Sequence, residues 1–101
     1  MGTKTKGRGI QMSLYEAVEV WKRISPKELV RYRCFRHLET GKYSVQSADF
    51  HLLPLDPARM ANLEKQYLEL LAEQAPDERA ESCFDSLRHA IEAHDREFNS
   101  Y

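Results

Sequence analysis

Hydrophobic side chains recur along the chain at two spacings, and the change of spacing divides the sequence into elements. From Leu14 to Ile24 the apolar positions fall every three to four residues, as they do on one side of a helix. Ser13 precedes this stretch and Glu16 follows three residues later, a spacing typical of a capping box at a helix start. The pattern predicts a first helix over residues 14–24.

The next four residues repeat the signal for a helix start. Ser25, Pro26, Lys27 and Glu28 combine a capping serine with a proline at the first helical position, where the missing N–H costs nothing. Only one or two turns fit before the spacing changes again. We therefore expect a short helical turn here.

From Leu29 onward the hydrophobic period becomes two, which predicts a β-strand with one face toward the core. The inward positions are expected to be Val30, Tyr32, Cys34 and Leu38, and the outward positions Arg31, Arg33, Phe35 and His37. Gly41 lies in a short polar connection, and residues 43–53 form a second extended run that completes an antiparallel hairpin.

The second strand of this hairpin changes phase partway along. Tyr43 and Val45 have one parity, whereas Ala48 and Phe50 have the other. One extra residue near Gln46 or Ser47, a β-bulge, restores a common inward face.

Two further helices follow the hairpin. Asp56 and Pro57 are a cap and a first helical residue, and the apolar stripe after them predicts a helix over residues 57–73. A second stripe, after Pro76, predicts a long helix over residues 77–98. The fold class is thus α+β: an α-(short turn)-β-β-α-α order, with a two-stranded antiparallel hairpin covered by helices.

A chain of 101 residues has room for one domain. Residues 1–12 are rich in glycine, threonine and cations without a hydrophobic period, so we expect a flexible arm or a remnant of cloning there and a single α+β domain over 13–101. No apolar run reaches the length of a membrane span, which favours a cytoplasmic protein without membrane contact.

Charge is distributed unequally along the chain although the net charge is only −1. Residues 1–42 carry a balance of +6 and residues 43–101 a balance of −7. Either the basic half folds against the acidic half, or the two remain separate surfaces that steer a partner or a second copy of the chain.

Few residues are spaced for catalysis or for a cofactor. Cys34 and Cys83 fall on apolar stripes and are expected to be core residues. His89 and His94 would need further ligands from the hairpin to hold a metal, and the glycines do not form a phosphate-binding loop. We therefore expect no metal, no cofactor and no enzymatic activity.

The most distinctive local feature is the outward face of the first predicted strand. Arg31, Arg33, Phe35 and His37 place an aromatic ring among cations, and they are our candidate binding residues. They point first to a small non-catalytic protein-interaction module that pairs with itself or with another protein. The alternative function is binding of single-stranded nucleic acid, and in a third reading these arginines merely pair with helix carboxylates.

Overall fold

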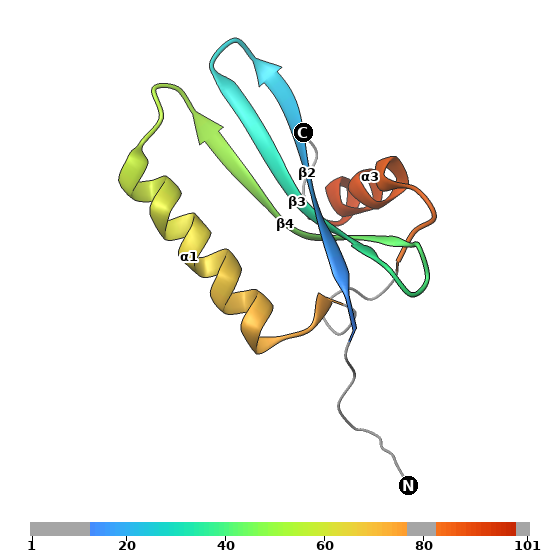
Figure 1. Ribbon diagram of the computed structural model, residues 1–101. Helices are drawn as coiled ribbons and strands as arrows, with labels where there is room; N and C mark the ends of the chain where they lie inside the picture. Colours follow the sequence, from blue (N-terminus) through green and yellow to red (C-terminus); the bar gives the residue numbers. More distant parts are fainter. Residues whose placement is uncertain (1–12, 77–82, 99–101) are drawn as a thin grey trace, which may run out of the picture.

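Three antiparallel strands in the order β2-β3-β4 form a sheet, with one helix on each face (Figure 1). The computed structural model describes residues 13–76 and 83–98, so the predicted arm over residues 1–12 lies outside the described residues. The elements are β2 (Tyr15–Ser25), β3 (Glu28–His37), β4 (Tyr43–Leu52), α1 (Pro57–Glu73) and α3 (Leu87–Phe98). The α+β class is confirmed, but the sheet has three strands instead of two.

The first element is a strand, so the predicted helix over residues 14–24 is wrong. β2 pairs with β3 without a break from Tyr15 to Arg23. Its β-branched and aromatic residues suit the pleated surface of a sheet, and Val18 and Val20 pack against the core. Pairing along the whole of β3 outweighs the local capping signal, because isolated helices of this length are marginal in water.

The predicted short helix after it is also wrong, because Pro26 and Lys27 form the turn that joins β2 to β3. The Ser25 hydroxyl accepts a hydrogen bond from the Lys27 backbone N–H at 3.3 Å. A serine at this position favours tight turns as well as helix starts, and here the second strand is close enough to pair.

The predicted hairpin is confirmed as β3 and β4, including its bulge. Arg33 lies opposite Ser47 and Cys34 lies opposite Val45, so Gln46 is the extra residue. The bulge brings the two phases of β4 onto the same face of the sheet, as the sequence predicted.

Helix α1 begins and ends at the predicted residues. The Asp56 carboxylate caps it by accepting hydrogen bonds from the backbone N–H groups of Ala58 and Arg59, at 3.0 and 3.3 Å. Pro57 occupies the first turn, where no intrahelical donor is needed.

Helix α3 is shorter than predicted, since it starts at Leu87. Residues 77–82 of the predicted helix lie outside the described residues. Phe84 is extended and exchanges two backbone hydrogen bonds with Tyr43, at 2.7 and 2.8 Å. The Ser86 hydroxyl then accepts from the His89 backbone N–H at 3.1 Å, which caps the helix. A stripe of apolar residues therefore continues from an extended segment into a helix.

The hydrophobic core lies between the sheet and α3. Val30, Tyr32 and Cys34 of β3 form its buried centre, and Leu87 and Ile91 of α3 pack against them. The inward parity predicted for these three residues is confirmed, but Leu38, the fourth residue predicted to point inward, lies beyond the end of β3 and is 43% exposed. β3 is the central strand, so both of its faces are available for packing, and α1 occupies the other one (Figure 1).

Candidate functional site

The four predicted binding residues share one face of β3, but that face is covered rather than exposed. Arg33 and Phe35 keep only 7% and 3% of their surface accessible, and His37 is equally enclosed. Arg31 is partly buried. The expectation that these side chains look out to water is wrong, because β2 makes β3 a central strand and α1 lies over its second face.

The two arginines on this face are paired with carboxylates of the same chain. Arg31 contacts Glu19 at 3.3 Å and Asp49 at 3.7 Å. Arg33 donates to Glu64 of α1 and also reaches Asp49 at 4.0 Å. The basic first half of the chain thus meets acidic groups of the second half at this face.

Arg33 is held tightly in this layer. Its guanidinium lies over the Tyr67 ring, 4.2 Å from the centroid, which adds a cation–π contact to the ion pair. Burial lowers the pKa of Arg33, but the hydrogen bond and charge of Glu64 outweigh burial and raise it. The same hydrogen bond lowers the pKa of Glu64 below its ordinary value. Both side chains are therefore charged at neutral pH.

Phe35 and His37 also contact side chains of the same chain. The Phe35 ring stacks on Tyr67 at a centroid distance of 6.2 Å. His37 Nε2 lies 2.8 Å from the Ser44 hydroxyl and 3.7 Å from the Cys83 thiol. These contacts fit an internal layer of polar and aromatic side chains.

The cysteines differ in their surroundings. Cys34 is buried, as predicted, and burial raises its pKa to about 12. Cys83 is only half-buried and lies beside His37. The expectation of a core position is therefore confirmed for Cys34 alone.

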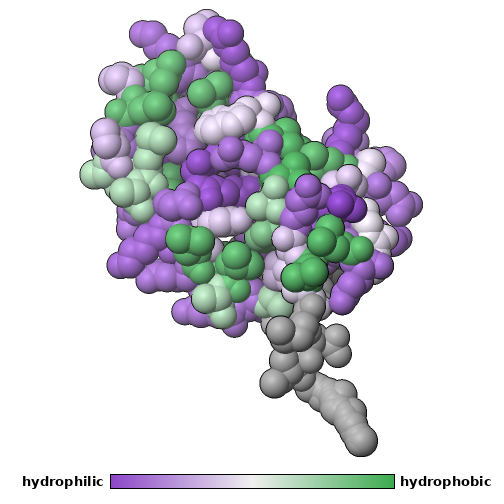
Figure 2. Space-filling model, viewed as in Figure 1, coloured by the Kyte–Doolittle hydropathy of each residue, from purple (hydrophilic) through white to green (hydrophobic). Residues whose placement is uncertain are grey.

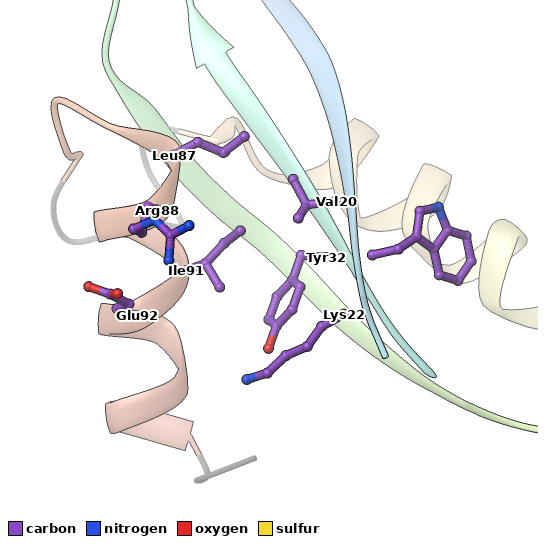
Figure 3. Close-up of a pocket in the computed structure, with 8 residues that line it drawn as sticks. Val20, Lys22, Tyr32, Leu87, Arg88, Ile91 and Glu92 are labelled. Carbon is purple, nitrogen blue, oxygen red and sulfur yellow. The ribbon is translucent and has the colours of Figure 1, made fainter. Parts of the chain in front are cut away.

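A shallow groove of about 400 Å³ opens between α3 and the β2 side of the sheet (Figure 3). Its walls are apolar, and charged side chains stand at its rim. Its lining includes Val20 and Lys22 from β2, Tyr32 from β3, and Leu87, Ile91 and Glu92 from α3. The groove exists because α3 contacts β4 closely and leaves the β2 side of the same face less covered.

The outer edge of β2 is open within the described residues. The backbone N–H of Leu38 donates to the Leu14 carbonyl, so Leu14 and Leu38 are a hydrogen-bonded pair. Such pairs recur at every second residue of an antiparallel ladder, so the backbone N–H and C=O groups of the even-numbered β2 residues point toward β3. The backbone groups of Glu19, Trp21 and Arg23 therefore point away from the sheet. The opposite edge differs, because Phe84 pairs with the first residue of β4 and the bulge interrupts that strand.

Hydrophobic side chains accompany this open edge. Trp21 is 49% exposed and Ile24, at the irregular end of β2, is 39% exposed. Figure 2 shows that hydrophobic residues reach the surface at several places among hydrophilic ones. Sequence reasoning missed this edge because a helix was predicted there, although the β-branched and aromatic residues of the segment were a signal for a strand.

Other kinds of site find no support in the described residues. They contain no group of three or more His, Cys, Asp or Glu side chains placed to hold a metal ion. No helix among them has both the length and the apolar character needed to span a membrane. No family model, curated protein or solved structure matches the chain.

Proposed function

We propose that this protein is a small, non-catalytic interaction module that associates with a second copy of itself through the open edge of β2. An extended strand with unused backbone donors and acceptors is a ready template for another strand. The observation that carries the proposal is the outer edge of β2 at Glu19, Trp21 and Arg23, which pairs with no other described strand.

The balance of buried and exposed hydrophobic groups supports association. Among the described residues, five hydrophobic side chains are buried and ten large ones are exposed. A core of this size leaves little net stability in a chain of about one hundred residues. Covering part of the exposed apolar surface in a dimer would add stability by mass action.

The alternative function, binding of single-stranded nucleic acid by the β3 face, has less support. A stacking platform needs aromatic rings and cations that reach the ligand. Here Phe35 is buried and Arg33 is paired with Glu64. We therefore place the interaction at β2 and not at Arg31, Arg33, Phe35 and His37.

The test blocks the outer edge of β2 without disturbing its inner edge. Proline at position 19 removes a backbone N–H that points away from β3, so the β2–β3 hydrogen bonds stay. Glu19→Gln is the matched control, because it removes the same charge and keeps the N–H. Light scattering after size exclusion should show a dimer for the native chain, a weakened dimer for the Glu19→Gln control, and a monomer for Glu19→Pro at the same concentrations.

A native chain that stays monomeric at every accessible concentration would overturn the proposal. So would a Glu19→Pro variant that is folded by circular dichroism and still dimeric.

A further inference from the structure

We infer that two copies pair through antiparallel β2 strands whose two-fold axis passes beside Trp21. This inference rests on the proposed function and assigns the register of the contact. Opposed residues in an antiparallel pair share a face of the sheet. Pairing about Trp21 places each Trp21 beside that of the second copy, and each Glu19 opposite Arg23 of the second copy.

Charge complementarity selects this register. Glu19 is half-exposed and contacts Arg31 of its own chain at 3.3 Å, and Arg23 is exposed beyond it on the same face. Pairing about Trp21 therefore creates two Glu19–Arg23 pairs, one at each side of the axis. Pairing about Glu19 instead sets the two Glu19 carboxylates opposite one another, which destabilises a sheet. It would also bring Glu16 opposite Lys22, but these side chains already pair with Arg36 and Asp95 of their own chain.

The same register covers the exposed Trp21 side chain. The Trp21 ring, already in contact with the Arg31 guanidinium at 5.5 Å, gains an aromatic neighbour at the centre of the interface. Ile24 is the extra residue at the irregularity between Arg23 and Ser25, so it lies just beyond the regularly paired stretch.

The groove beside β2 belongs to this interface. It lies on the α3 face, along Val20 and Lys22. The two-fold axis of such an antiparallel pair is perpendicular to the sheet, so both copies have α3 on the same face of the joined sheet. Lys22 of the second copy then lies opposite Val20, and its methylene groups extend the apolar wall while its ammonium keeps its contact with Asp95 of its own chain.

A charge exchange tests the register. Glu19→Arg alone and Arg23→Glu alone each place like charges opposite one another at both sides of the axis. Each variant should raise the dissociation constant of the dimer about tenfold or more. A one-to-one mixture restores opposite charges at both positions, so it should form a heterodimer with an affinity close to that of the native homodimer.

Cysteine cross-linking gives a second, independent measurement. Directly opposed residues of this type have Cα atoms about 5.5 Å apart, which a disulfide spans. In a Cys83→Ser background, Trp21→Cys should form a covalent dimer on mild oxidation. Arg23→Cys is the matched control and should not cross-link to itself, since the two positions 23 lie about 13 Å apart along the strands.

The outcomes separate this inference from the proposed function. If Glu19→Pro abolishes the dimer but the charge-exchange mixture stays monomeric, the register is wrong and the interaction edge stands. Rescue by mixing Glu16→Lys with Lys22→Glu would also overturn the register, because those positions oppose one another only in pairing about Glu19. If Glu19→Pro leaves the dimer intact, both are wrong.

Discussion

On the side that faces α3, β3 contributes Val30, Tyr32 and Cys34, and the neighbouring helix supplies aliphatic side chains. On the side that faces α1, the same strand contributes Arg33 and Phe35, and the helix supplies a carboxylate and a tyrosine ring. Both sides exclude water, one by apolar packing and the other by pairing charges and stacking rings. An alternation of apolar and polar residues therefore does not by itself place the polar ones at the surface.

The helices reflect this difference. α3 buries Ala90 against the core, whereas no residue of α1 is buried. Removal of polar groups from water is favourable only when their hydrogen bonds are replaced, and the α1 side leaves the Nε atoms of Arg31 and Arg33 without a hydrogen-bond partner. We expect the α3 side to contribute more of the stability.

The largest effect is expected from the apolar side. Tyr32→Ala removes a fully buried ring and should lower the free energy of unfolding by about 3–5 kcal/mol. Tyr32→Phe keeps the ring but loses the hydroxyl that donates to Asp95 at 2.8 Å, so its loss should be about 1–2 kcal/mol. Urea denaturation measures both. A loss under about 1 kcal/mol for Tyr32→Ala would contradict the assignment of the core.

A smaller effect is expected from the polar side. Arg33→Ala removes the ion pair and the cation–π contact, and should lower the free energy of unfolding by about 1–3 kcal/mol. Glu64 is half-exposed, so water solvates it once the arginine is gone, and this limits the loss. Arg36→Ala is the control, since its contact with Glu16 lies at the surface and should matter little.

The same comparison can be read from a double-mutant cycle. Arg33→Ala combined with Glu64→Ala should lose less than the sum of the single variants, because the two side chains act as a pair. Additive losses would mean that the α1 side is held by packing alone.

The smallest effect is a dependence on pH confined to the polar side. Burial lowers the pKa of His51, and the charges of Arg31 and Arg59 lower it further. The unfolded chain then binds a proton more readily than the folded one, so this contribution to stability is present above the ordinary pKa of 6.5 and is lost as pH falls below it. Denaturation of His51→Gln across this range should show a flatter profile than the native chain, and an unchanged slope would contradict the assignment.

Local signals predicted some elements correctly, whereas the local capping signals at Ser13 and Ser25 predicted helices that are absent from the described residues. Asp56 and Pro57 mark the start of α1, and the parity change in β4 marks the bulge at Gln46. Both depend on neighbouring residues only. The predicted start of α3 was wrong because Phe84 pairs with Tyr43, a contact between residues far apart in the chain.

The candidate site failed for a related reason. Arg33 is covered because α1 packs on its face of β3, and Arg31 is flanked by strands on both sides. The prediction placed the helices on the apolar face and made β2 one of them. Residues 14–24 carry apolar positions compatible with both periods, so periodicity alone did not decide between them. The pairing partner of β3 decided it, and sequence patterns do not reveal that partner.

Emission of Trp21 tests the central claim most directly, because it is the only tryptophan in the chain and lies half-exposed on the β2 edge. The account predicts that its emission maximum shifts to shorter wavelength as the native protein is concentrated and dimers form, and that Glu19→Pro shows no such shift. An emission maximum that stays constant while light scattering reports a dimer would place the interface elsewhere and contradict the account.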